Sequence, residues 1–155
     1  DADRANLECF AAAYVSFDRF LVYNSFGTEA DPKGLIDWLI SSDKQVYLPR
    51  VEGKDIVPAP YGETKKGAFG VDEPTGPAYA GKIDVAVIPL LAVDFNGCRL
   101  GYGGGYYDRY LSKSDALRVG LGYGVQLCER LPEDEGDEPL DVFLCERGIY
   151  SFGRK

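Results

Sequence analysis

The sequence contains no histidine and no methionine, and its four cysteines form no Cys-x-x-Cys pair. These absences argue against a zinc site, because structural and catalytic zinc is held mainly by histidines and closely spaced cysteines. We therefore interpret Cys9, Cys98, Cys128 and Cys145 as reduced thiols of a cytoplasmic protein. The absence of methionine, together with a start at Asp1, is typical of a truncated chain.

Long apolar runs are also absent, so we expect neither a membrane span nor a signal peptide. Positive charge is scarce: 17 basic residues stand against 25 acidic ones, and a net charge of −8 argues against nucleic acid as the main partner. The charge is uneven, with four basic and two acidic residues over 99–118 but one basic and seven acidic over 129–141. The length of 155 residues predicts a single domain over 1–155.

A cluster of glycines is the most informative feature. Gly101, Gly103, Gly104 and Gly105 lie between a buried strand and the start of a helix, and two tyrosines and Asp108 follow directly. Glycine lets the backbone approach a ligand closely, and backbone N–H groups at the head of a helix bind anions. The loop lacks the Gly-Lys-Ser/Thr of a P-loop and the third glycine of a dinucleotide fingerprint. It therefore predicts a phosphate or nucleotide site of another type.

The rest of the chain alternates between helix and strand patterns. Asp31 and Pro32 are typical of a helix start, and Leu35, Ile36, Leu39 and Ile40 would form the buried stripe of that helix. Gly, Pro and charged residues predict a loop over 61–81, and Asn96-Gly97 predicts a turn. We expect helices over 3–14, 32–40 and about 104–111, and strands over 20–23, 45–49, 55–60, 82–89, 118–124, 142–145 and 149–152. This order predicts an α/β fold with a mostly parallel sheet, whose ligands bind beyond the carboxyl ends of the strands.

The segment RLGYGGGYYDR, residues 99–109, resembles the signature of the 5-formyltetrahydrofolate cyclo-ligases, also called 5,10-methenyltetrahydrofolate synthetases. Other pieces resemble the family in order and spacing, from about Val22 onward: YLP at 47–49, GVDEP at 70–74, IDVAVIP at 83–89, VDF at 93–95, QL at 126–127 and LP at 131–132. The resemblance implies a Rossmann-like three-layer α/β/α fold. It also implies ATP- and magnesium-dependent conversion of 5-formyltetrahydrofolate to 5,10-methenyltetrahydrofolate, with release of ADP and phosphate.

The resemblance also implies roles for individual residues. Arg99 and Tyr107 would be catalytic, and ATP would contact Arg99, Leu100, Gly101, Tyr102, Gly103, Gly104, Gly105, Tyr106 and Tyr107. The folate, with or without a polyglutamate tail, would contact Glu29, Tyr102, Gly103, Gly104, Gly105 and Tyr106, while Asp108 and Asp137 would bind magnesium. The enzyme is expected to be monomeric.

Several alternatives stay open at this stage. Arg99 is as well explained by a surface ion pair with Asp94 or Asp108, and one of the two adjacent tyrosines must belong to the core, since neighbours on a helix face different ways. Glu73 fits a loop-ordering carboxylate slightly better than a ligand contact. The family carries a basic N-terminal helix, whereas the helix expected over 3–14 has Arg4 as its only basic residue, so the basic helix of the family is expected to be missing. The chain could then be a non-catalytic nucleotide- or folate-binding relative, or a sugar-phosphate isomerase or transferase of similar topology.

Overall fold

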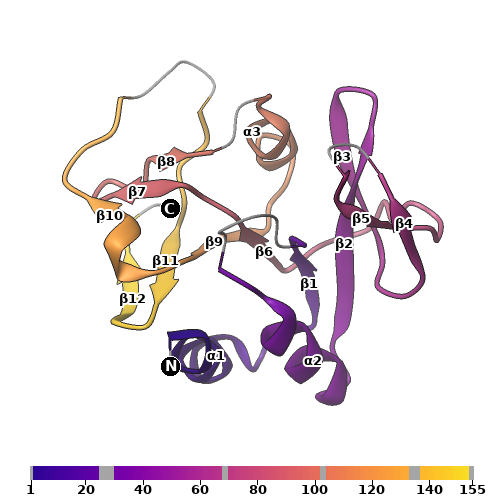
Figure 1. Cartoon of the computed structure of the whole chain (residues 1–155), viewed down its shortest axis with the longest axis horizontal. Coiled ribbons are helices and arrows are strands. Elements are labelled where there is room, and N and C mark those ends of the chain that lie inside the picture. The colour runs from indigo at the N-terminus through magenta and orange to yellow at the C-terminus, as the bar shows by residue number, and fades with distance from the viewer. Residues whose placement is uncertain (1, 25–29, 68–69, 102–103, 133–136, 154–155) are drawn as a thin grey trace.

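A seven-stranded sheet forms the centre of the protein (Figure 1). The computed structural model describes residues 2–24, 30–67, 70–101, 104–132 and 137–153. Five parallel strands occupy the middle of the sheet, in the order β2 (Gln45–Glu52), β1 (Arg19–Val22), β6 (Val85–Ile88), β9 (Leu117–Leu121) and β11 (Val142–Cys145). Antiparallel strands β3 (Asp55–Pro60) and β12 (Gly148–Ser151) close the two edges. The expected mostly parallel sheet is confirmed.

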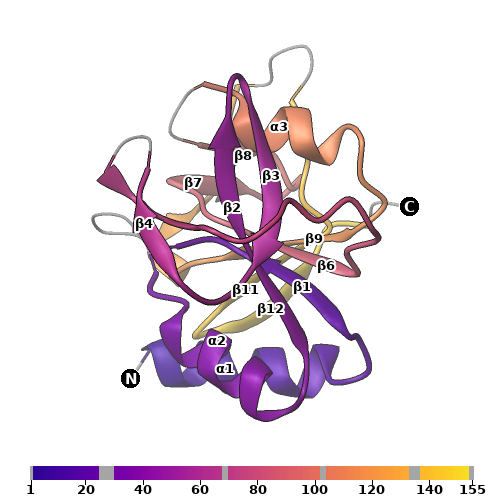
Figure 2. The same ribbon diagram turned by 90° about the vertical axis from the view of Figure 1, so that its right-hand side faces the viewer.

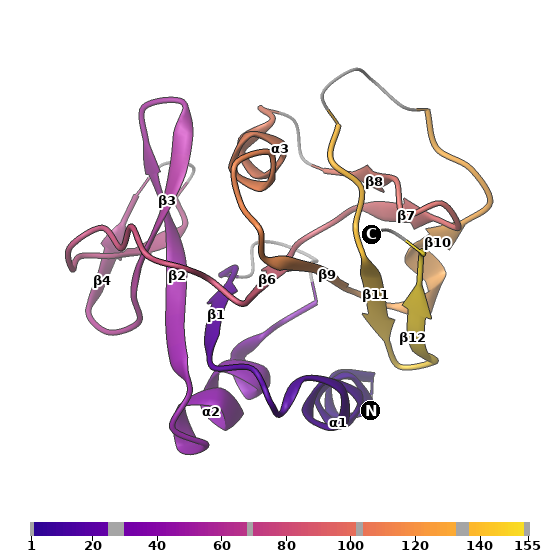
Figure 3. The same ribbon diagram turned by 180° about the vertical axis from the view of Figure 1, so that it is seen from behind.

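Helices lie on both faces of this sheet. Figures 1 and 3 show α1 (Ala2–Tyr14) and α2 (Lys33–Ser41) on one side, and α3 (Tyr106–Leu111) on the other. Side chains of β6 alternate between the two: Val85 and Val87 belong to the core under α1 and α2, whereas Ala86 and Ile88 belong to the core on the side of α3. All four residues are buried, as expected for a strand covered on both faces. The three-layer α/β/α arrangement is therefore confirmed.

The order of the parallel strands locates the place where a ligand would bind. Numbered along the chain, the strands run 2-1-3-4-5, so the winding direction reverses between β1 and β6. In such sheets ligands bind at the carboxyl ends of the strands on either side of the reversal. The chain leaves β1 through Tyr23 and Asn24, and leaves β6 through Pro89.

Two small sheets complete the fold, and neither was expected from the sequence. The first joins β10 (Leu127–Cys128), β7 (Ala92–Asp94) and β8 (Arg99–Leu100), with Asn96 and Gly97 in the expected turn between β7 and β8. Its β7–β8 hairpin separates β6 from the glycine loop, which therefore does not follow β6 directly. The second pairs β4 (Thr64–Lys66) with β5 (Asp72–Pro74), so the prediction of a loop over 61–81 is wrong in these parts.

Other boundaries differ less. Helix α2 buries Leu35, Ile36 and Leu39, but Ile40 is 42% exposed and does not belong to the buried stripe. Strand β9 ends at Leu121, before a short 3-10 helix over Gly124–Gln126. The four cysteines are free thiols, as expected. None of the described helices has the length and apolar character that a transmembrane span requires.

Candidate active site

The loop between β8 and α3 has a backbone that only glycine adopts easily. Gly104 and Gly105 have φ of +77° and +68°, and Gly105 occupies the N-cap of α3. A side chain in this left-handed region costs about 1–2 kcal/mol per residue. At Gly104 a Cβ would also lie 2.9 Å from the Tyr106 ring. Tyr102 and Gly103, also predicted to bind ligands, lie outside the described residues.

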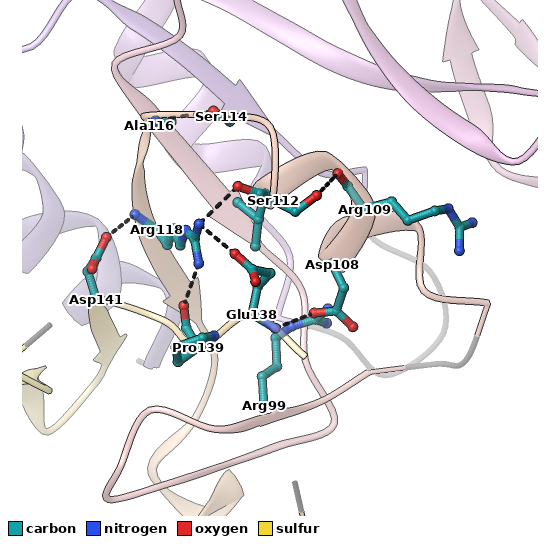
Figure 4. Close-up of polar contacts among 11 residues, drawn as sticks. Arg99, Asp108, Arg109, Ser112, Ser114, Ala116, Arg118, Glu138, Pro139 and Asp141 are labelled. Atoms are coloured by element: carbon teal, nitrogen blue, oxygen red, sulfur yellow. Dashed lines mark hydrogen bonds and ion pairs between the residues drawn. The ribbon is translucent and has the colours of Figure 1, made fainter. Parts of the chain in front are cut away.

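Arg99 lies beneath this loop and has a buried side chain. The guanidinium folds back so closely that a Cβ at Gly101 would lie 2.7 Å from Nη1. Nη1 donates to the carbonyl of Pro89 at 2.9 Å, and Nη2 lies 3.8 Å from Asp108 Oδ1 (Figure 4). Only 6% of the Arg99 side chain is exposed, against 26% for Asp108, so this is a pair between a buried guanidinium and a partly exposed carboxylate and not the surface pair considered from the sequence.

Burial lowers the pKa of Arg99, because the charged guanidinium has lost much of its hydration. Asp108, Tyr107 and Asp137 act in the opposite direction and favour the charged form. Within the described residues the Nε atom is buried without a hydrogen-bond partner. A poorly satisfied buried cation is suited to a polyanionic ligand, which would supply the missing acceptors.

Asp94, the other partner considered for Arg99, has a different role. It is buried, and Oδ1 accepts hydrogen bonds from the backbone N–H groups of Asn96 and Cys98 at 2.9 and 3.0 Å. Oδ2 accepts one from the N–H of Leu131 at 2.8 Å. Asp94 therefore orders the turn between β7 and β8 and ties it to the segment after β10.

The structure brings the two predicted metal ligands to the same end of α3. Asp108 belongs to the first turn of this helix, and Oδ1 accepts a hydrogen bond from the backbone N–H of Glu138 at 3.1 Å. Glu138 directly follows Asp137, so Asp137 lies on the same side of the sheet as Asp108. The electrostatic effect of Asp137 on Arg99 agrees with this placement.

The oxygen atoms at this end of α3 fit a magnesium ion. Both contacts of Asp108 described above use Oδ1, which leaves Oδ2 without a protein partner among the described residues. Among all the residues that the structure describes, no cluster of three or more acidic or cysteine side chains could hold a metal. Magnesium differs from calcium and zinc in this respect, since one or two carboxylates with waters and phosphate oxygens are sufficient for it.

The two adjacent tyrosines face different surroundings, as expected. Tyr107 packs against the apolar cores on both faces of the sheet, and the Arg99 guanidinium lies 5.7 Å from its ring centroid. The ring of Tyr106 instead lies 5.1 Å from the guanidinium of Arg109. Tyr107 thus belongs to the core and also contacts the buried cation. Leu100, the second residue of β8, is 48% exposed.

Arg109 connects the site to the β2–β3 hairpin. Its Nε donates to the carbonyl of Lys54 at 2.9 Å, Nη2 contacts the same oxygen, and Nε lies 3.8 Å from Asp55 Oδ1. In Figure 2 this hairpin extends along the sheet as far as α3. Arg109 therefore holds a neighbouring element in place beside the glycine loop.

The predicted folate contact Glu29 lies outside the described residues. A cavity of about 430 Å³ lies beyond the end of β1, and Asn24, Asp31, Tyr61 and Lys66 are among its lining residues. Glu73 does not line it. Glu73 is buried in β5, and Oε2 accepts a hydrogen bond from the N–H of Val51 in β2 at 3.0 Å, so it joins two strands and does not order a loop.

Sequence reasoning missed two residues behind the site, Arg118 and Glu138. They form a 2.8 Å ion pair, and only 4% of the Arg118 side chain is exposed. The sequence did contain a signal for Arg118, because it is the one charged residue in the otherwise apolar strand LRVGL. A charge buried in a strand needs a partner of opposite charge. The partner itself could not be predicted, because it comes from a distant acidic loop.

Comparison with known proteins agrees with this geometry. The model of the 5-formyltetrahydrofolate cyclo-ligase family matches residues 10–146. The 5-formyltetrahydrofolate cyclo-ligase of Haemophilus influenzae is 35% identical over 132 residues, which cover 77% of this chain and 71% of the relative. The Escherichia coli K12 protein of the same name is 34% identical over 144 residues, covering 84% and 79%.

Solved structures show the same relationship. The 5,10-methenyltetrahydrofolate synthetase of Aquifex aeolicus superposes with a TM-score of 0.87 at 30% identity, covering 99% of this chain and 82% of that one. The synthetase of Mycoplasma pneumoniae shares the fold, with a TM-score of 0.75 at 21% identity, covering 94% and 85%. The chain therefore belongs to the 5-formyltetrahydrofolate cyclo-ligase family of ligase enzymes.

Proposed function

We propose that the protein converts 5-formyltetrahydrofolate to 5,10-methenyltetrahydrofolate, consuming ATP with magnesium and releasing ADP and phosphate. One observation carries the proposal in this chain: the buried Arg99 guanidinium lies under the glycine loop and beside Asp108. A buried cation under a glycine-rich loop suits the transfer of a phosphoryl group, because this reaction depends mainly on positioning and charge stabilisation.

The reaction would proceed in two steps. The formyl oxygen attacks the γ-phosphorus of ATP, and the bond to the β–γ bridging oxygen breaks, so ADP leaves. The neighbouring folate nitrogen then attacks the activated formyl carbon and loses its proton to water, and phosphate departs with the oxygen. Negative charge on the transferring group is the main obstacle in the first step, and the second step needs an oriented nucleophile.

The residues of the chain fit the requirements of the first step. Backbone amides of Gly101 and of the loop around Gly104 and Gly105 would hold the phosphate oxygens at the start of the helix. Arg99 would stabilise the charge of the transferring group, since its buried position strengthens electrostatic interactions. Tyr107 would hold the Arg99 side chain through its ring.

Asp108 and Asp137 would hold the magnesium ion at the start of α3. Bound there, the ion would neutralise phosphate charge and orient the triphosphate. Asp108 is well suited because Oδ1 is already engaged by the Glu138 amide, which orients the carboxylate and leaves Oδ2 available. The metal would therefore bind to a carboxylate that is already positioned.

The remaining contacts follow the same proposal. The folate would occupy the region around the cavity after β1, with Glu29 accepting from the N–H donors of the pterin ring, and Tyr106 and the segment 102–105 facing both substrates. Leu100 and Tyr102 would border the nucleotide. We further propose a monomeric enzyme that acts in the cytoplasm, where free thiols such as those of this chain persist.

The direct test is product formation. Incubation of the protein with 5-formyltetrahydrofolate, ATP and magnesium is expected to produce the methenyl compound, detected by its absorbance and confirmed by mass spectrometry. Reactions without ATP or with EDTA serve as controls. ATP hydrolysis that does not depend on folate, or binding of both ligands without product, would instead identify a non-catalytic relative.

Asp108→Asn is expected to raise the magnesium concentration for half-maximal rate by about 10-fold or more and to lower kcat, because a neutral amide is a much weaker magnesium ligand. A titration of rate against magnesium measures both effects. Asp115→Asn is the matched control, since Asp115 is an exposed carboxylate just after α3. An unchanged magnesium dependence in Asp108→Asn would remove the metal assignment.

A further inference from the structure

A second buried arginine lies behind the proposed metal site (Figure 4). Arg118 extends from β9, and its Nη2 donates to the carbonyl of Leu111 at 2.9 Å and pairs with Glu138 Oε1 at 2.8 Å. Its Nη1 donates to the carbonyl of Pro139 at 3.3 Å. The guanidinium thus joins the last residue of α3 to the acidic segment that precedes β11.

Glu138 connects this arginine to the site. Its side chain faces Arg118, while its backbone N–H donates to Asp108 Oδ1 at 3.1 Å. Glu138 is therefore connected to both ends of α3. Its N–H binds Asp108 at the start of the helix, and its carboxylate binds Arg118, which in turn donates to the carbonyl of Leu111 at the end. Asp137 directly precedes Glu138, and a trans peptide holds consecutive Cα atoms about 3.8 Å apart. The place of Asp137 beside Asp108 therefore depends on how Glu138 is held.

The charges explain why a cation is needed at this point. The Asp108 carboxylate lies beside the guanidinium of Arg99, and the Glu138 carboxylate pairs with that of Arg118, so each of these acidic side chains has a buried cation next to it. The segment 129–141 also carries seven acidic residues and one basic one. Like charges at short distance repel each other strongly where water is partly excluded. Without Arg118 the acidic segment would be expected to move away from Asp108.

A purely structural role explains these contacts less well. Buried ion pairs often stabilise a fold no better than well-packed apolar residues do, and the Nε of Arg118 is buried without a partner among the described residues. Leu111, whose carbonyl accepts from Arg118, belongs to the apolar core on this face of the sheet. An apolar residue at position 118 would therefore suit the strand, but it could not hold Glu138.

We propose that Arg118 is a positioning residue, which acts through Glu138 to hold Asp137 beside Asp108 and so sets the affinity of the enzyme for magnesium with ATP. The inference rests on the proposed function, because it takes these two aspartates as the metal ligands. The new element is that a residue that contacts neither the metal nor the substrates holds the metal ligands in position.

The first test compares Arg118→Met with Arg50→Met. Arg50 is a matched control: its Nη2 lies 2.8 Å from Glu52 Oε2, and its Nη1 donates to two backbone carbonyls, but it lies in β2. Arg118→Met is expected to weaken the binding of ATP with magnesium, measured by calorimetry without folate, by about 10-fold or more, the scale found for residues that orient metal ligands. Arg50→Met is expected to lower stability without this change.

The second measurement needs neither metal nor activity. Amide hydrogen exchange of Glu138, followed by NMR in the metal-free protein, is expected to accelerate by about 10-fold or more in Arg118→Met, because the segment opens locally. The kcat at saturating magnesium is expected to change less than the magnesium requirement. Arg118→Lys, which retains the charge, is expected to recover part of the binding.

Glu138→Gln keeps the backbone N–H that Asp108 accepts and removes only the ion pair, so it tests the inference even where Arg118→Met does not fold. It is expected to weaken binding by about 3-fold or more, and the effects of the two changes should not add, since both break one pair. Unchanged binding and unchanged Glu138 exchange in the folded variants would overturn the inference. If the wild-type protein bound no magnesium with ATP, the proposed metal site would fail, whereas the exchange measurement would still decide whether Arg118 holds Glu138.

Discussion

Replacing Arg99 by lysine is expected to lower kcat/KM by about 100-fold or more, and replacing it by methionine by about 1000-fold, the range reported for the loss of one preorganised charge-stabilising group. The reason is geometric as well as electrostatic. Arg99 contacts the Pro89 carbonyl with Nη1 and Asp108 with Nη2, so the planar fork is held at two points. Lysine has one ammonium group and cannot make both contacts in this geometry.

The effect should be mainly on kcat, because the guanidinium is proposed to act on charge that develops during transfer. Steady-state kinetics with varied ATP and folate would separate kcat from KM, and a urea unfolding curve would show whether each variant is folded. Arg109→Lys is the matched control from the same signature, since Arg109 binds Lys54 of the β2–β3 hairpin. We expect it to lose less than about 10-fold. If Arg99→Lys retained nearly full activity, Arg99 would be a structural residue only.

Gly104→Val is expected to abolish detectable binding of ATP, a loss of about 100-fold or more, while the protein remains folded. The backbone of Gly104 has φ of +77°, which a β-branched residue avoids most strongly. Its Cβ would also displace the Tyr106 ring, whose Cε2 atom would be 2.9 Å away. Both effects move the backbone that is proposed to hold the phosphates.

Calorimetry with ATP and magnesium measures this loss directly. Gly148→Val separates backbone strain from damage to the site, because Gly148 also has a positive φ, of +120°, but no atom of the described residues lies within 4 Å of a Cβ there, and Gly148 is the first residue of β12. That control should lose stability and retain affinity. If Gly104→Val bound ATP as tightly as the wild type, the glycine loop would be a turn without a role in binding.

Local signals in the sequence were sufficient for most of the architecture. The apolar run over 82–89 has the composition of a strand buried on both faces, and β6 is such a strand. The helix after Asp31 and Pro32 and the last two strands also follow from local patterns, although α2 starts at Lys33, one residue later than expected, with Pro32 as its N-cap. The short strands β4, β5, β7, β8 and β10 escaped prediction, because each has two or three residues and is stabilised by its pairing partner and not by its own composition.

Some site residues could likewise be predicted from the sequence, whereas the roles of others could not. A local motif was enough to point to Arg99, the glycine loop and Asp108, since they lie within ten residues and the chemistry of each is evident from its type. The burial of Arg99, the core role of Tyr107 and the structural role of Asp94 depend on surroundings that no local pattern describes.

The sequence by itself determined the α/β class, the family and the position of the loop, because these depend on periodicity and on contiguous residue types. Only the tertiary structure decided that Glu138 meets the start of α3 and pairs with Arg118. Such contacts join segments about 20–30 residues apart in sequence, at distances of 2.8 and 3.1 Å. They form because buried charges require partners, and a partner is selected by where the folded backbone brings it and not by its place along the chain.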